Sequence, residues 1–478
     1  MKLKILSSLV LAMCALTVQA KPTAYLPIVM DAHLEQQIDH MFALTTGSPM
    51  SKPYALSEID IALRQLKRID NSLYDSVRIQ LKRYRGSDDI SRKGIKFTLN
   101  NDKSMGIANQ RGLTSDEWGQ GFFEGIWRPN DSTLLQVGLD YRIDSGELIN
   151  YNTFFSIAGD SLQLDLGYKE HWFSPFKMSS QLISTNAESS PSISLGLSKP
   201  LSNWWNFDFE LYYSQLEEVE QGIKFQEQWH DGRPRLAGTH ISIEPFEGWK
   251  LGLNRLMHFG GGPRDVSFRD IMKAYFDPAG NDNSDNVNDG NDGELGDQLA
   301  SVTSLFVFDW GLPSELYFEY GGEDTSGETS LGNGLNVFGN QVFASGLYFP
   351  VISNDWSLRY EYTSWHNAWY TNAIYKFGNT NNDNVYGHFA GDQRTFGDAT
   401  PSDIHVMQVG YNEDIHSTWQ LKLSRINNKD SDTDYTAATE VQLLNSRRWQ
   451  KYRVETQLTF GKDVFDESYS YLSMAWFW

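Results

Sequence analysis

The chain has 478 residues and is acidic, with 61 Asp and Glu side chains against 40 Lys and Arg and a formal net charge of −21 at pH 7. The phosphate backbone of nucleic acid would repel so negative a chain, which argues against nucleic acid as a partner. The sequence contains one cysteine, Cys14, and it lies in the N-terminal leader. The exported chain is therefore expected to hold no disulfide, no zinc–cysteine site and no cysteine nucleophile.

The first residues have the pattern of a secretory signal peptide, predicted over residues 1–20. Lys2 and Lys4 precede an apolar run over residues 5–18. A cleavage site of the small-x-small type ends at Ala20, so we expect the mature chain to begin at Lys21. No segment approaches the roughly 18 uninterrupted apolar residues of a membrane-spanning helix, so no helical anchor is expected.

Residues 21–94 are predicted to form a small helical bundle. Apolar side chains recur at helical spacing over residues 34–42, 59–69 and 74–84. Ser57 is placed to cap the second helix, and Ser72 and Gly86 are placed to start and stop the third. About 70 residues with so few large apolar side chains would be marginally stable alone, so we expect the bundle to dock on a larger body.

From residue 95 to residue 478 the apolar period is two, which is the period of a β-strand. Clear alternations run over residues 135–141, 162–168, 205–213, 249–253, 316–320, 356–362, 419–423 and 454–460. The interleaved residues are polar or small, so one face of each strand suits hydrocarbon and the other suits water. The final strand, with Leu472, Met474, Trp476 and Trp478 on one face, is typical of outer-membrane barrels.

The connections between these predicted strands are alternately long and short. Counting back from the C-terminus, long loops at 461–467, 426–437, 366–404, 322–340 and 260–300 alternate with short turns at 446–448, 412–417, 351–355 and 311–314. A soluble sandwich has no reason to sort its loops by end, whereas membrane barrels have short periplasmic turns and long external loops. The pattern predicts a transmembrane antiparallel β-barrel, with room for about 16 to 20 strands.

Several motifs resemble those of the Wzi-type capsule-assembly proteins. The longest is LNRLMHFGGGPRDVSF over residues 253–268, which is followed by GDQL at 296–299 and GEDTSG at 322–327. Pro53 ahead of the second helix and YGHFAGD at 386–392 follow the same family pattern. These matches occur in the family's order along the chain.

The resemblance implies a barrel of about 18 strands in the bacterial outer membrane, plugged at its periplasmic end by the helices and with its loops at the cell surface. It implies a lectin-like protein that binds capsular or extracellular polysaccharide and attaches it to the cell surface. We expect a monomer without cofactor or enzymatic activity, whose other partners are outer-membrane lipids and, during biogenesis, the barrel-assembly machinery. The alternative is a channel for polysaccharide or small solutes.

In the predicted topology the family-like motifs fall at the external ends of strands, around one mouth. Sugars are bound by aromatic faces and by charged or planar groups that make paired hydrogen bonds. The candidate polysaccharide-binding residues are Arg255, Arg264, Glu323, Asp324, Trp365, His366, Trp369, Tyr370 and Asp392, and the structural positions of the motifs are Gly260, Gly261, Gly322 and Gly327. Alternatively, the charged residues pair to hold the loops shut and the aromatics mark the membrane girdle.

Three further segments invite a catalytic or metal-binding interpretation. The Asp/Asn-rich run at 281–297 lacks the register of an EF-hand, which favours a solvated loop over a metal site. The GDSL tetrapeptide at 159–162 lacks the aspartate three residues before a histidine that an esterase needs, so a hairpin turn is predicted. Glu323 and Asp324 are adjacent and would point to opposite faces of a strand, unlike a glycosidase pair. No catalytic residue and no metal site are predicted.

Overall fold

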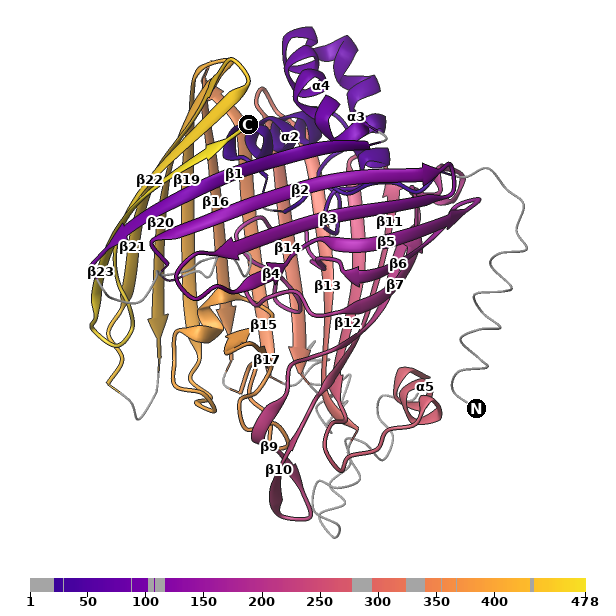
Figure 1. Cartoon of the computed structure of the whole chain (residues 1–478), viewed down its shortest axis with the longest axis vertical. Helices are drawn as coiled ribbons and strands as arrows, with labels where there is room; N and C mark the ends of the chain where they lie inside the picture. Colours follow the sequence, from indigo (N-terminus) through magenta and orange to yellow (C-terminus); the bar gives the residue numbers. More distant parts are fainter. Residues whose placement is uncertain are drawn as a thin grey trace.

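In the computed structural model the chain forms a β-barrel with helices packed at one end (Figure 1). The structure describes residues 21–28, 30–86, 88–101, 107, 117–276, 295–323, 340–353, 355–366, 368–429 and 434–478. The predicted signal peptide, including Ala20, lies outside the described residues, which begin at Lys21.

The barrel wall is a closed antiparallel sheet of 18 strands. Its segments are β1 (Asp88–Asn100), β2 (Gly119–Asn130), β3 (Thr133–Arg142), β4 (Leu148–Asn150), β5 (Thr153–Gly159), β6 (Leu162–Tyr168), β7 (Ser192–Leu197), β8 (Asp208–Gln215), β11 (Arg235–Phe246), β12 (Trp249–Phe259), β13 (Gly296–Asp309), β14 (Pro313–Glu323), β15 (Gln341–Ser353), β16 (Trp356–Trp365), β19 (Ser402–Asp414), β20 (Ser417–Asn428), β21 (Ala438–Trp449), β22 (Tyr452–Lys462) and β23 (Ser468–Phe477). β4 and β5 both pair with β3 and form one interrupted strand, and β1 pairs with β23 to close the barrel. The predicted fold class is confirmed.

Alternate residues of the strands form two chemically different faces. On β23, Leu472, Met474 and Trp476 are 43%, 47% and 39% exposed on the outer face, whereas Ala475 and Phe477 are buried inside. Leaving such side chains in water would cost about 1.5–3 kcal/mol each, so the outer face suits hydrocarbon. Among the described residues, none of the helices is long and apolar enough to cross a membrane.

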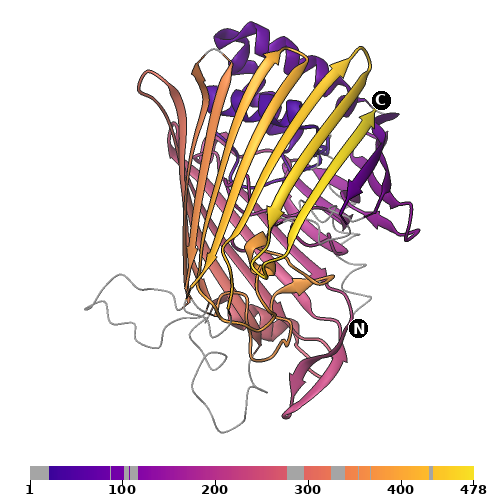
Figure 2. The ribbon, with the colours of Figure 1, turned by 90° about the vertical axis from the view of Figure 1, so that its left-hand side faces the viewer.

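The connections at the two ends of the barrel differ in length (Figures 1 and 2). Short turns join strands at the end that holds the helices and the C-terminus, at 131–132, 160–161, 247–248, 310–312, 415–416 and 450–451. The opposite end, called the loop end below, carries the long connections 169–191, 216–234, 260–295 and 366–401. The turn predicted at 446–448 lies at 450–451, because Arg447 and Arg448 still pair with Val454 and Arg453 of β22.

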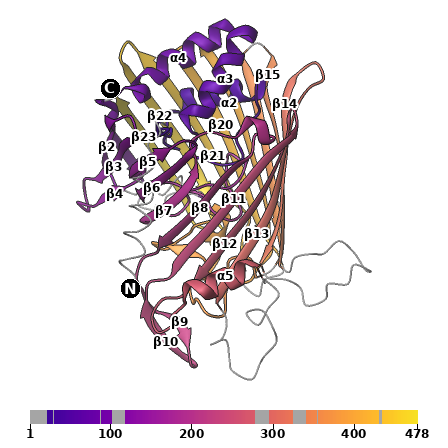
Figure 3. The ribbon, with the colours of Figure 1, turned by 90° about the vertical axis from the view of Figure 1, so that its right-hand side faces the viewer.

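Three helices plug the end that carries the short turns, called the plug end below (Figures 1 and 3). They are α2 (Ala32–Leu44), α3 (Leu56–Ile69) and α4 (Asn71–Arg85). Their apolar core continues into the wall, where Ile126 of β2 and Leu134 of β3 join the same buried cluster. The expectation that the bundle docks on a larger body is therefore met. β1 begins at Asp88 rather than at the predicted residue 95, because Asp88 already pairs with Trp127 of β2.

The helix caps differ from those predicted from the sequence. α4 begins two residues earlier than expected, because the Asp70 carboxylate, and not Ser72, caps the helix by accepting the Leu73 N–H (2.9 Å). The Ser57 hydroxyl does not cap α3 but donates to the Ser198 carbonyl (2.6 Å) in the connection between β7 and β8. Ser57 thus ties the plug to the barrel.

Candidate functional site

A segment that we call the strap, residues 169–191 between β6 and β7, folds into the barrel lumen. It is buried along almost its whole length. Carboxylates of the wall hold it, because Glu319 accepts a hydrogen bond from the Ser174 hydroxyl (2.8 Å) and Glu361 accepts one from the Lys177 main-chain N–H (2.9 Å). The strap therefore occupies space that an open pore would leave to water.

A second segment, the cap, fills the lumen at the loop end. It comprises residues 368–401 between β16 and β19, and contains β17 (Thr380–Asn381), β18 (Asn384–Val385) and η4 (Phe389–Asp392). The strap supports it, since Ser184 donates its N–H to the Tyr386 carbonyl (2.7 Å) and the Asn186 amide donates to the Val385 carbonyl (2.8 Å). Strap and cap thus form one packed body inside the barrel at the loop end.

Five of the predicted site residues meet in this cap and its rim. Trp365, Trp369 and Tyr370 are buried, with 2%, 0% and 3% of their surface exposed. The Tyr370 main-chain N–H donates to the Glu323 carboxylate (2.5 Å) at the end of β14, and the ring of Tyr370 packs edge-on against Trp365 at 5.8 Å. These aromatic rings form a core that holds the cap in place, and their faces are not open to a ligand.

Asp392, the fifth of these residues, joins the cap to the strap. Its carboxylate accepts hydrogen bonds from the Val385 N–H (2.7 Å) and from the Asn186 side-chain amide (2.7 Å). Burial raises the pKa of Asp392 to about 7, and these two hydrogen bonds oppose the increase only partly.

The raised pKa of Asp392 predicts that the cap loosens as the pH rises. The folded carboxyl binds its proton more tightly than the unfolded one, so its contribution to stability is complete below pH 4 and is lost as the pH rises through about 7. We expect hydrogen exchange of residues 384–392 to be faster at pH 8 than at pH 5, beyond the intrinsic effect of pH. Asp392→Asn keeps an acceptor for Val385 and should abolish this difference. An unchanged difference in the variant would assign the effect to another group.

Arg394 was missed by the sequence prediction, although it is the one arginine between residues 368 and 401. Its guanidinium donates to the carbonyls of Trp369 and, at 3.2 Å, Thr400, and it lies 5.7 Å from the centre of the Trp365 ring. A buried guanidinium with these partners fixes both the entry and the exit of the cap. A lone arginine in a long aromatic loop was the available sequence signal.

The two predicted arginines lie outside the cap and its rim. Arg255 belongs to the same outward row of β12 as Leu253, so it projects from the outer wall and not into the mouth. Arg264 is buried and donates to the Lys224 carbonyl (2.9 Å), which fastens the loop after β12 to the hairpin of β9 (Val219–Phe225) and β10 (Gln228–Gly232). Arg255 is a correction to the predicted grouping, whereas Arg264 stays at the loop end, beside the cap; both arginines hold loop segments.

The remaining predicted positions are placed as follows. His366 is exposed at the rim, where its main-chain N–H donates to the Gln341 carbonyl (2.9 Å), whereas Asp324 and Gly327 lie outside the described residues. Gly322 lies on β14. Gly260 and Gly261 adopt φ values of +68° and +93°, and a Cβ on Gly261 would meet the Pro234 backbone nitrogen at 3.0 Å. Glycine is therefore required at that bend.

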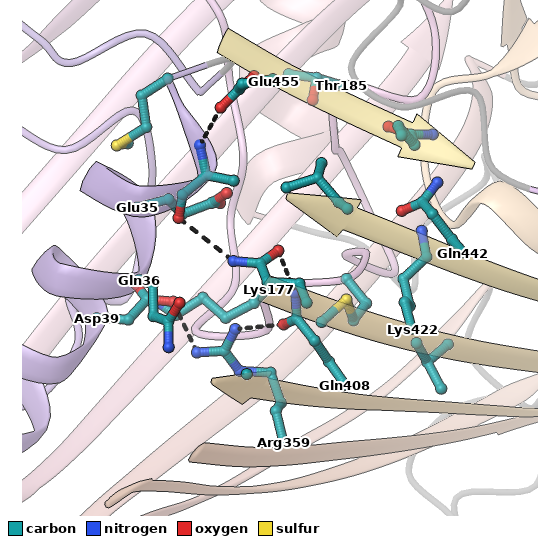
Figure 4. Close-up of a pocket in the computed structure, with 18 of the residues that line it drawn as sticks. Glu35, Gln36, Asp39, Lys177, Thr185, Arg359, Gln408, Lys422, Gln442 and Glu455 are labelled. Atoms are coloured by element: carbon teal, nitrogen blue, oxygen red, sulfur yellow. Dashed lines mark hydrogen bonds and ion pairs between the residues drawn. The ribbon is translucent and has the colours of Figure 1, made fainter. Parts of the chain in front are cut away.

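A polar chamber of about 250 Å³ lies in the lumen between α2, the strap and the wall (Figure 4). The labelled residues that line it are Glu35, Gln36, Asp39, Lys177, Thr185, Arg359, Gln408, Lys422, Gln442 and Glu455. The Glu455 carboxylate accepts the Ala32 N–H (2.9 Å), so the wall holds the start of α2. The chamber is polar and has room for several waters, since one water needs about 10–15 Å³ of space open to a water-sized sphere.

Asp39 of α2 joins the plug, the strap and the wall through two ion pairs at the edge of this chamber. Its carboxylate oxygens lie 2.8 Å from the Lys177 ammonium and 2.7 Å from the Arg359 guanidinium, and the three side chains are 2%, 3% and 8% exposed. Burial alone would raise the pKa of Asp39, but the two cations outweigh it and hold that pKa well below its usual range. The carboxylate is thus charged throughout the neutral range.

The structure describes only part of the segments that suggested metal binding or esterase chemistry. Within the described part of the chain, no cluster of three or more acidic, histidine or cysteine side chains is placed to hold a metal ion. Of the Asp/Asn-rich run, residues 281–294 lie outside the described residues. Residues 159–162 form the hairpin turn predicted for them, with Asp160 at a φ of 50° between β5 and β6.

The solved structure of one outer-membrane protein shares this architecture. The outer-membrane protein Wzi of Escherichia coli, described as involved in group 1 capsule assembly and as a carbohydrate-binding β-barrel, is similar with a TM-score of 0.70 and 14% identity. That similarity covers 95% of this chain and 99% of Wzi. OccAB4 of Acinetobacter baumannii has a TM-score of 0.47 and 9% identity, over 83% of this chain and 99% of its own.

Sequence comparisons also match this chain to capsule-related proteins. A Klebsiella pneumoniae protein described as an uncharacterized 55.8 kDa protein in the cps region is 33% identical over 95 residues, which span 20% of this chain and only 17% of that relative. The family model of the capsule assembly protein Wzi matches residues 95–471, which is most of the barrel. The chain therefore belongs to the family of the capsule assembly protein Wzi.

Proposed function

We propose that this protein is a lectin-like barrel of the outer membrane that binds capsular or extracellular polysaccharide and attaches it to the cell surface. Its membership of the capsule-assembly family supports this proposal, as does the fold it shares with a carbohydrate-binding barrel. The observation that carries it is the packing of the strap and the cap inside the barrel at the loop end, above the polar chamber, where a channel would keep an open aqueous path. The folded loops then present a rigid surface.

The proposed orientation places the helices in the periplasm and the cap at the cell surface. Support comes from the sorting of the connections, because short turns of outer-membrane barrels lie in the periplasm and long loops outside. The predicted signal peptide over residues 1–20 agrees with export. Outer-membrane lipids would contact the outward apolar band, and the barrel-assembly machinery would insert the chain as a monomer.

The proposed sugar-binding surface is formed by exposed aromatic side chains of the cap and of the β9–β10 hairpin. The hairpin extends the cap, since Lys224 donates its N–H to the Ile374 carbonyl (2.8 Å). Trp229 on the hairpin is 38% exposed and Phe396 on the cap is 46% exposed, with Phe377 packed edge-on against Phe396 at 6.2 Å. Open aromatic faces stack on the C–H surfaces of sugars.

The roles of the predicted site residues change in this proposal. Trp365, Trp369, Tyr370, Glu323 and Asp392 would fix the cap from beneath, so that the exposed rings need no ordering when the polysaccharide binds. His366, which is exposed at the rim, stays a candidate for direct contact.

A double substitution, Trp229→Ala with Phe396→Ala, should weaken polysaccharide binding. Two stacking contacts are worth about 1–3 kcal/mol together, or roughly 5- to 150-fold in Kd. We would measure the Kd of detergent-purified protein for capsular polysaccharide, and polysaccharide retention on cells at matched surface levels. Trp204→Ala is the control, because Trp204 is 71% exposed but lies at the plug end. Equal binding by the wild type, the double variant and the Trp204 variant would contradict the proposed surface. An absence of binding by the wild type would contradict the proposed function.

A further inference from the structure

A short amphipathic helix, α5 (Phe268–Phe276), lies against the outside of the barrel near the loop end (Figures 1 and 3). The outward-facing Arg255 of β12 holds its C-terminal turn, donating to the carbonyls of Ala274 (2.8 Å) and Tyr275 (3.1 Å). The Tyr275 hydroxyl is also 2.8 Å from the Thr239 hydroxyl on β11. Two strands of the outer wall thus fix the helix.

The start of α5 is fixed as well. The Asp270 carboxylate accepts hydrogen bonds from the main-chain N–H (2.8 Å) and the hydroxyl (2.5 Å) of Ser267, and the Ser267 hydroxyl accepts the Asp270 N–H (3.3 Å). This reciprocal cap occupies the helix's acidic side chain. Arg269 and Lys273 are both exposed, and with the single carboxylate of Asp270 they leave α5 with a formal charge of +1.

The residue that holds the C-terminal turn of α5, Arg255, lies in the outer half of the apolar band. Leu253 is 54% exposed, and Val302, its partner on β13, is 43% exposed on the same outer row. Arg255 follows Leu253 on that row. It lies six residues from Trp249 at the plug end, a rise of roughly 15 Å along a tilted strand, within a band of about 25 Å. The helix is therefore continuous with the face that suits hydrocarbon.

The face of α5 turned away from the wall has two stripes. Phe268 and Met272, one turn apart, are 76% and 37% exposed, and Arg269 and Lys273 form a parallel exposed basic stripe. Ile271 packs instead with the wall cluster. An apolar stripe beside a basic one is the pattern of helices that lie in a membrane interface. The basic stripe stands out on a chain with a net charge of −21.

We infer that α5 is an interfacial helix that inserts Phe268 and Met272 into the outer leaflet of the membrane and pairs Arg269 and Lys273 with lipid phosphate groups. This inference rests on the proposed membrane orientation. It adds a specific lipid-binding element, on the outer wall, that is separate from the polysaccharide surface. It also gives Arg255 a role, which is to hold the helix at this height.

Site-directed fluorescence quenching tests the insertion. Residues 21–478 contain no cysteine, so Met272→Cys carries a unique environment-sensitive dye, and Phe396→Cys on the cap is the matched control. In phosphatidylcholine vesicles, lipid-borne quenchers should quench the dye at position 272 several-fold more than the dye at 396, and aqueous iodide should do the reverse. Equal quenching of both dyes by iodide would overturn the inference.

The phosphate contact is tested by an Arg269→Gln, Lys273→Gln variant. Adding phosphatidylglycerol to the vesicles should increase lipid quenching at position 272 in the parent protein but not in this variant, and inorganic phosphate should not reproduce the effect. An equal response of both proteins would refute the pairing with phosphate. Polysaccharide binding in detergent should be unchanged in this variant. The binding measurements on the Trp229/Phe396 variant therefore test the proposed function, and the quenching measurements test the role of α5. Either proposal can fail without the other.

Discussion

Replacing Asp39 by alanine is expected to release the plug from the barrel. The substitution leaves the Lys177 ammonium and the Arg359 guanidinium buried without their shared carboxylate. Breaking a buried ion pair by removing one partner costs about 3–5 kcal/mol, because the remaining charge is uncompensated. We expect limited trypsin digestion of folded protein to cut residues 21–86 much faster in Asp39→Ala than in the wild type, while the barrel stays resistant.

The control for this prediction is Asp60→Ala. Asp60 of α3 pairs with Arg85 of α4, but their side chains are 47% and 32% exposed, and such surface pairs are worth about 1 kcal/mol or less. Asp39→Ala combined with Lys177→Met should recover part of the lost stability, since one buried charge is then removed. Equal digestion rates for the Asp39 and Asp60 variants would show that the plug is held by its apolar contacts alone.

The two ion pairs of Asp39, with Lys177 and Arg359, should also persist in mild acid. Its folded pKa lies well below that of an unfolded carboxyl, so its contribution to stability is complete above pH 4 and is lost only as the pH falls through the folded value. The plug and the cap are thus expected to respond to pH in opposite senses, because the pKa of Asp392 is raised instead.

The sequence was sufficient for the barrel because the signals of a barrel are local. An apolar period of two, as at residues 249–253, reports which side chains of a strand share a face, and loop lengths can be counted directly. The same period of two predicts that Arg255 faces outward, because it lies two residues after Leu253 on the same strand. The family-like motif around Arg255 pointed instead to the mouth, and the two signals disagree.

The closed cap could not be read from the sequence in the same way. Trp365, Trp369 and Tyr370 have the residue types of a sugar site, but whether their faces are open depends on contacts with Gln181 and Glu323, which are distant along the chain. No periodicity encodes such contacts. The ion pairs of Asp39 have the same character, since they join three segments separated by more than a hundred residues.

Arg394→Met is expected to loosen the cap and lower polysaccharide affinity. The substitution leaves the buried carbonyls of Trp369 and Thr400 without a donor, at about 1–3 kcal/mol each, and removes the cation from the Trp365 ring. We expect a Kd at least tenfold higher, and faster hydrogen exchange across residues 384–392. Arg425→Met, at an exposed arginine of β20, should change neither.

Conductance distinguishes loosening of the cap from opening of the barrel. Beneath a loosened cap, the strap and α2 still lie across the lumen, held by Glu319, Glu361 and Asp39. Arg394→Met alone should therefore conduct little in planar bilayers, as should Asp39→Ala alone, because each variant keeps the other barrier. Only the double variant should show steady single-channel currents. Steady currents in either single variant would mean that the lumen has one barrier, which would favour the alternative of a channel for polysaccharide or small solutes over a closed lectin-like barrel.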